Sequence, residues 1–118
     1  MRFMIVIKAN KESEAGIMPS QALLEEMGKY NEELVKAGVM LAGDGLHASS
    51  KGARVRFSGG KATVIDGPFA ETKEFLAGFY LVEARDLNEA IQLAAKIPPA
   101  SVGSIEVRPI RPIREATR

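Results

Sequence analysis

The sequence contains no cysteine and only one histidine. Without cysteine, the chain can form no disulfide, no thiolate metal site and no cysteine nucleophile. One histidine alone also falls short of the ligand set of a zinc site. The glycines do not form a phosphate-binding loop with its lysine. We therefore predict no metal site and no cofactor.

Long apolar runs and a strong excess of one charge are also missing. No stretch approaches the roughly 20 apolar residues of a membrane-spanning helix, and the apolar residues 3–7 are too few for a signal sequence. The 118 residues carry 16 basic and 15 acidic side chains, so the broad basic surface of a nucleic-acid binder is absent. We expect one domain, residues 1–118, that is cytoplasmic and contacts neither nucleic acid nor membrane.

Short apolar strands and two amphipathic helices are what the chain does contain. Alternation and β-rich composition predict the strands, and apolar spacings of three and four predict the helices. The turn at 58–60, Ser-Gly-Gly, indicates a β-hairpin, and Asp86 with Glu89 has the spacing of a capping box. The predicted strands are residues 3–7, 39–42, 54–57, 61–65, 78–84 and 104–107, and the predicted helices are residues 20–37 and 87 to about 97.

This element order predicts a ferredoxin-like α+β fold, an antiparallel sheet with two helices on one face and an extra β-hairpin. Residues 3–7 and 79–84 are apolar at nearly every position, so both faces of those strands should be buried. Because the helices cover only one face, we expect the other to pack on a second copy of the chain, forming a homodimer.

The chain also resembles a known family at several places along its length. Residues 66–74 have the sequence Asp-Gly-Pro-Phe-Ala-Glu-Thr-Lys-Glu, and Gly-Phe-Tyr follows at 78–80. Further matches lie at residues 30–34, 37–38, 43–46 and 105–109. These motifs resemble the DGPF branch of the YCII-related family. The resemblance implies a dimeric α+β barrel with a small-molecule cleft between sheet and hairpin, and a functional link to extracytoplasmic-function sigma factors, without implying a particular reaction.

One feature of other YCII-like proteins is missing. The family implies a histidine near the start of the first helix, paired with an aspartate in an Asp-Pro-Phe segment after the second helix. Residues 16–24 contain no histidine, and Ile-Pro-Pro-Ala stands at 97–100. Any acid–base chemistry would therefore have to use other residues.

Asp66 and His47 are the candidate catalytic residues. Asp66 ends a predicted strand at a Gly-Pro turn, where the backbone can approach a ligand closely and where Pro68 and Phe69 would border it. Alternatively, its carboxylate caps the next turn by accepting backbone N–H bonds. His47 is the only imidazole, the side chain that titrates near neutral pH. It is either a base or an ordinary surface histidine.

Four other residues are candidate ligand contacts. Glu71 and Lys73 follow the turn and either hold a polar ligand or form a salt-bridged cluster. Asn31 falls on the apolar face of the first helix beside Tyr30, so its amide either pins a backbone edge or lines a cleft.

Three functions remain open. The first is a small-molecule-binding or regulatory dimeric domain, and the second is a cofactor-independent enzyme that performs acid–base chemistry on a small polar or aromatic substrate. The third is a dimeric scaffold in which the signature residues only build the fold.

Overall fold

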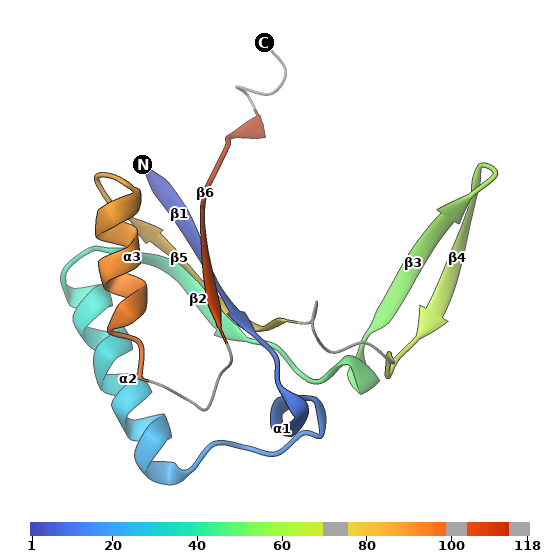
Figure 1. Ribbon diagram of the computed structural model, residues 1–118, viewed down its shortest axis with the longest axis horizontal. Helices are drawn as coiled ribbons and strands as arrows, with labels where there is room; N and C mark the ends of the chain where they lie inside the picture. Colours follow the sequence, from blue (N-terminus) through green and yellow to red (C-terminus); the bar gives the residue numbers. More distant parts are fainter. Residues whose placement is uncertain (70–75, 99–103, 114–118) are drawn as a thin grey trace.

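The computed structural model describes residues 1–69, 76–98 and 104–113. Its elements follow one another in the predicted order, with one short helix and one 3-10 turn added (Figure 1). They are β1 (Arg2–Lys8), α1 (Lys11–Glu14), α2 (Gln21–Lys36), β2 (Met40–Gly45), η1 (Ser49–Lys51), β3 (Ala53–Ser58), β4 (Lys61–Asp66), β5 (Leu76–Glu83), α3 (Leu87–Ala95) and β6 (Ile105–Pro109).

Four of the strands form an antiparallel sheet in the order β2-β5-β1-β6. The two central strands are therefore β5 and β1, which pair from Arg2 opposite Glu83 to Lys8 opposite Leu76. This order, with α2 and α3 as the crossovers, is that of the ferredoxin-like fold. The predicted fold class is confirmed.

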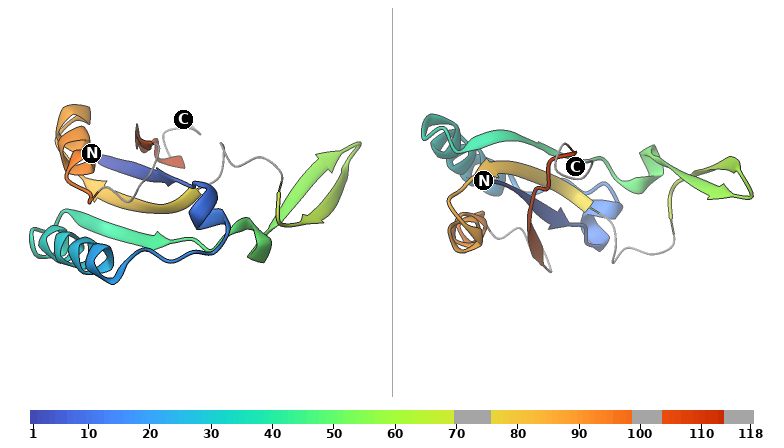
Figure 2. Two further views of the ribbon diagram at one scale, coloured as in Figure 1. Left: turned by 60° about the horizontal axis from the view of Figure 1, so that its bottom comes forward. Right: turned by 90° about the horizontal axis from the view of Figure 1, so that it is seen from above.

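The core lies between this sheet and the two long helices. Phe3, Ile5 and Val82 are fully buried on one sheet face, where Leu34 of α2 and Ala90 of α3 pack against them. Neighbouring residues of a strand point to opposite faces, so the side chains between these positions point away from the helices. Figure 2 shows both helices beside the same side of the strands.

We call the sheet surface away from the helices the open face. Its centre is apolar, because Met4 lies opposite Leu81 and Val6 lies opposite Phe79 on β1 and β5. Val6 is 9% exposed, and the other three are half-buried in the single chain. No described helix covers this surface.

The helix ends follow the expected capping chemistry. The Ser20 hydroxyl accepts the Leu23 N–H at the start of α2, and Gly38 has a φ of 71° after its end, as a helix-terminating glycine does. Helix α1 lies between residues 7 and 20, where the sequence predicted neither a strand nor a helix. Asn10 and Ser13 form a reciprocal capping box there, which closes one helical turn without any apolar stripe.

The hairpin β3–β4 forms a separate two-stranded sheet. In Figure 1 it extends to the right of the main sheet, and α2 and α3 lie to the left. The radius of gyration is 16.2 Å, whereas a compact domain of this length has about 13.5 Å. Within the described part of the chain, no helix is long and apolar enough to cross a membrane.

Candidate functional site

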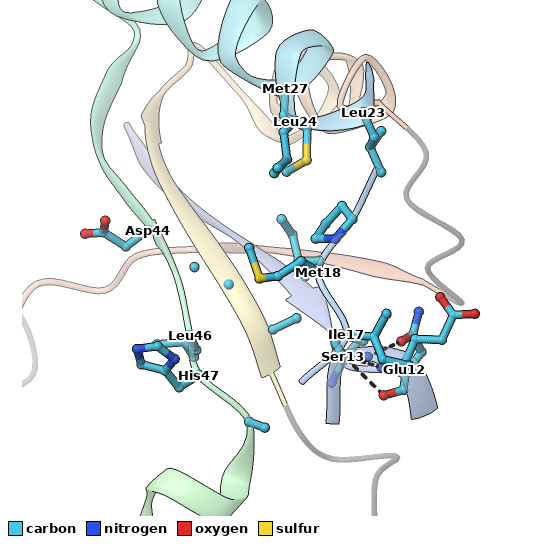
Figure 3. Close-up of a pocket in the computed structure, with 18 of the residues that line it drawn as sticks. Glu12, Ser13, Ile17, Met18, Leu23, Leu24, Met27, Asp44, Leu46 and His47 are labelled. Carbon is cyan, nitrogen blue, oxygen red and sulfur yellow. Dashed lines mark hydrogen bonds between the residues drawn. The ribbon is translucent and has the colours of Figure 1, made fainter. Parts of the chain in front are cut away.

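A cavity of about 880 Å³ opens on the helix side of the sheet, and we call it the α2 cavity. Its walls are the residues 16–20 before α2, the first turns of α2, and the ends of β1, β2 and β5. Figure 3 shows Leu23, Leu24 and Met27 reaching into it from α2, with Met18 facing them. The volume falls within the range of ordinary small-molecule sites.

The lining of the α2 cavity is largely apolar and rich in methionine. Met18, Met27 and Met40 all border it, together with Leu23 and Leu46. Methionine is flexible and polarisable, so it fits the flat faces of unsaturated molecules and adapts to irregular shapes. Met18 is 74% exposed, which leaves its side chain without a close-packed position in the free protein.

A hydrogen-bonded pair supplies fixed polar groups within this lining, which also includes the charged residues Lys8, Glu12 and Asp44. Asn31 of α2 and Tyr80 of β5 both line the cavity, and the Tyr80 hydroxyl donates to Asn31 Oδ1. Among the described residues, the Asn31 amide nitrogen has no protein acceptor, so its two N–H groups are available to a ligand. Burial raises the pKa of Tyr80, and the bond to Asn31 opposes the rise, so Tyr80 is a neutral donor at physiological pH.

Tyr30, the neighbour of Asn31, is directed elsewhere. Its hydroxyl donates to the Leu93 carbonyl oxygen at 2.6 Å and so ties α2 to α3. Burial raises its pKa first, and the nearby Tyr80 and Glu33 add to the rise. Tyr30 does not line the α2 cavity, whereas Asn31 does. A position at a cleft was one of the two alternatives that the sequence left open for the Asn31 amide.

His47 borders two cavities. It lines the α2 cavity and also a second one of about 450 Å³, which lies between η1, the base of β3 and the start of β5. In Figure 3 the His47 ring and the Asp44 carboxylate lie on one side of β2 and Met18 lies on the other. The imidazole therefore stands at the rim of the α2 cavity rather than beside Met18.

The Asp-Gly-Pro-Phe turn is docked on η1. The Gly67 N–H donates to the Gly52 carbonyl oxygen at 3.0 Å, and the Phe69 N–H donates to the Ser49 hydroxyl at 3.2 Å. A Cβ on Gly67 would lie 1.7 Å from the Ser49 carbonyl oxygen, so no other residue fits without a backbone shift. The Gly67–Pro68 peptide bond is cis.

Glu14 of α1 also binds η1, on which the Asp-Gly-Pro-Phe turn is docked. Its carboxylate accepts the Ser49 N–H at 2.9 Å and the Ser49 hydroxyl at 2.6 Å. The Ser49 hydroxyl thus links α1 to the turn at Phe69. Phe69 lines the second cavity, and the Arg54 guanidinium lies 4.3 Å from the centre of its ring. The Asp-Gly-Pro-Phe turn thus fixes the base of the hairpin to the body of the domain.

The remaining predicted site residues do not gather in one place. Asp66 pairs with Ala53 across the hairpin and lines neither the α2 cavity nor the second cavity. No described backbone N–H donates to its carboxylate, so the alternative cap is not formed within the described residues. Pro68 also lines neither cavity. Glu71 and Lys73 lie outside the described residues.

Sequence reasoning missed the segment at 16–20 and the role of Glu14. Residues 9–18 show no periodicity, and the apolar pair Ile17 and Met18 just before the Pro19-Ser20 helix start is the one local sign that this segment faces something apolar. The contact between Glu14 and Ser49 spans 35 positions, and no local pattern predicts it.

The topology and the α2 cavity define a ferredoxin-like α+β domain with a small-molecule-sized cavity beside its first long helix. The model of the YCII-related domain matches residues 1–114, and the chain belongs to this family. It is 38% identical over 92 residues to an uncharacterized protein of Rhizobium meliloti (strain 1021), covering 76% of this chain and 74% of that protein.

A solved structure similar to this chain is a 5-chloro-2-hydroxyhydroquinone dehydrochlorinase from Burkholderia phenoliruptrix AC1100, in complex with 2,5-dihydroxybenzoquinone. The similarity has a TM-score of 0.48 at 15% sequence identity and covers 94% of each chain.

Proposed function

We propose that this chain is a small-molecule-binding domain whose ligand occupies the α2 cavity. The observation that carries the proposal is the Asn31–Tyr80 pair in an otherwise largely apolar lining of sufficient volume. An apolar wall supplies affinity, and a few fixed polar groups supply orientation. The ligand expected here is a small, mainly apolar molecule with a hydrogen-bond acceptor that meets the Asn31 amide.

Thermal unfolding in the presence of small acids, phenols and nucleotides tests this proposal. A ligand that binds only the folded chain stabilises it by about 2.7 kcal/mol at a concentration 100 times its Kd. A rise in Tm with ligand concentration is the expected result for at least one acid or phenol. No rise with any compound would contradict the proposal and favour the scaffold alternative.

Two tyrosine variants show whether the ligand binds in the α2 cavity. Tyr80→Phe removes the hydroxyl that orients the Asn31 amide, and we expect it to weaken ligand binding about tenfold, equivalent to about 1.4 kcal/mol. Tyr30→Phe is the matched control, because it deletes a hydroxyl that bonds to Leu93 outside the cavity. It should cost about 1 kcal/mol of stability and leave ligand affinity unchanged. Equal effects of the two variants on affinity would place the ligand elsewhere.

The alternative function, cofactor-independent acid–base chemistry, is favoured by one observation. His47 borders both cavities, so a bound molecule in either would have an imidazole at its edge. Asp66, the other candidate catalytic residue, lines neither cavity, so the cavity walls do not bring it to such a molecule. Conversion of a bound compound by the wild-type chain and not by His47→Gln, followed by mass spectrometry, would support this alternative.

We further propose that the chain is a homodimer joined through the open face. The apolar block formed by Met4, Val6, Phe79 and Leu81 supports it, since the described helices leave this surface uncovered. The DGPF branch, a cytoplasmic location and a regulatory role linked to a sigma factor stay predictions of the sequence.

A further inference from the structure

The hairpin β3–β4 has two chemically different faces. Val55 lies opposite Val64 and Phe57 lies opposite Ala62, so these side chains share one face. Phe57 is 79% exposed, Val64 is 64% exposed and Val55 is 49% exposed. The opposite face carries basic side chains, including Arg56 across from Thr63. We call the face with Val55, Phe57 and Val64 the apolar arm face.

This exposure is costly for the hairpin. A two-stranded sheet is at best marginally stable in water unless a third strand or a helix covers one of its sides. Among the described elements, β3 and β4 pair only with each other, and the docked turn at Gly67 holds just the base. No described element covers the apolar arm face, so a further surface packed against it would stabilise these six-residue strands.

The position of the hairpin indicates which surface that is. In Figure 1 the hairpin lies on the side of the main sheet away from α2 and α3, the side of the open face. Among the described residues, the chain thus has an uncovered apolar sheet face and, on the same side of the sheet, a hairpin that carries an uncovered apolar face. A copy of the chain that stacks on the open face comes to lie beside the hairpin.

Symmetry and charge favour a second copy over an unrelated partner. A two-fold axis places each hairpin beside the other copy, so one contact geometry covers both hairpins at once. The margins of the open face carry both signs of charge, with Arg2 opposite Glu83 and Arg108 beside Glu106. The chain has a net charge of only +1, so self-association meets little repulsion.

We propose that the hairpin is an arm that packs its apolar arm face against a second copy of this chain. The inference rests on the homodimer proposed above and adds a second contact region to it. In the proposed dimer, β3 and β4 of each subunit contact the other subunit.

Sedimentation velocity over a range of micromolar concentrations tests the arm with two neighbouring substitutions. Val64→Glu places a charge on the apolar arm face and should weaken dimerisation at least tenfold. Thr63→Glu is the matched control, since it makes the same change one residue earlier, on the opposite face beside Arg56. It should dimerise like the wild type. Val64→Thr, which keeps the β-branched shape, should give an intermediate affinity and keeps the test valid if Val64→Glu disturbs the hairpin.

Hydrogen exchange of residues 53–66 supplies an independent measurement. Their amides should exchange slowly in concentrated wild-type protein and faster on dilution below the dimer Kd. A monomeric wild type, or a Val64→Glu variant that dimerises normally, would overturn the arm proposal. If Leu81→Glu on the open face abolishes dimerisation and Val64→Glu does not, the homodimer stands without the arm. Ligand stabilisation, measured on the same samples, reports separately on the α2 cavity.

Discussion

Two glycines of this chain lie in opposite steric surroundings. A Cβ at Gly67 would meet the Ser49 carbonyl oxygen at 1.7 Å, whereas a Cβ at Gly28, inside α2, has nothing within 4 Å. Gly67→Ala should therefore destabilise the chain by about 1–3 kcal/mol, as overpacking does. Gly28→Ala should stabilise it by about 1 kcal/mol, because alanine loses less backbone entropy in a helix.

Urea unfolding followed by circular dichroism measures both glycine variants. Since the Gly67 N–H is bonded to the Gly52 carbonyl oxygen just after η1, the Gly67→Ala variant should also show faster hydrogen exchange in the hairpin. A Gly67→Ala chain as stable as the wild type would mean that the turn is not docked on Ser49.

The two tyrosines determine how the stability of the folded chain should change at alkaline pH. Burial raises the pKa of both Tyr80 and Tyr30, so the folded state holds these protons to higher pH than the unfolded state does. Stability should be unaffected by them below about pH 10, the ordinary tyrosine pKa, and should fall as the pH rises beyond it.

Absorbance at 295 nm checks the alkaline prediction directly, because these are the two tyrosines of the sequence and it has no tryptophan. Both should ionise later in the folded chain than in urea. Tyr80→Phe should remove about half of the amplitude. Ionisation of both tyrosines at the pH of a free tyrosine would contradict their burial between α2 and the sheet.

At the scale of the elements, α3 depends on its N-terminal cap. The Asp86 carboxylate accepts the Glu89 N–H at 2.9 Å, and Glu89 accepts the Arg85 N–H at 3.0 Å. Asp86→Ala should lower the free energy of unfolding by about 1 kcal/mol. Asp86→Ser, which keeps a cap acceptor, should recover most of it in chemical denaturation. Equal losses for both would show that the cap does not hold α3.

The elements that the sequence predicted well are those with a local cause. Helix α2 has an apolar stripe and a glycine end, and the hairpin has alternating strands around Gly59 and Gly60, both with positive φ. Helix α1 was missed because a single capped turn has no periodicity. Strand β2 was predicted to end at residue 42 and continues to Gly45.

The extension of β2 has a tertiary cause. Its Gly-Asp-Gly end resembles a turn, yet it pairs with β5 down to Gly45 opposite Gly78. A Cβ at Gly78 would lie 2.9 Å from the Asp44 carbonyl oxygen, so glycine permits this close strand contact. At the site, too, a contact between residues distant in the sequence could not be predicted from a local pattern. The spacing of α2 put Asn31 on its apolar face, but the hydroxyl that binds its amide belongs to Tyr80, 49 residues away.

At the scale of the whole molecule, the sequence indicated strands that are apolar on both faces, and the open face is an apolar surface that the described helices leave uncovered. Burying its four central side chains gives a favourable free energy roughly proportional to the apolar area removed from water. A charge at its centre would have to be buried without a partner, which is costly. The oligomeric state should therefore respond sharply to one substitution there.

Leu81→Glu is the variant that tests this surface, because Leu81 lies opposite Met4 at the middle of the open face. We expect the wild type to be a dimer at micromolar concentration by light scattering and Leu81→Glu to be a folded monomer. Val35→Glu is the matched control, since Val35 is 59% exposed on α2, on the helix side of the sheet, and its substitution should leave the dimer intact. A monomeric wild type, or a dimer that survives Leu81→Glu, would show that the chain does not associate through this face.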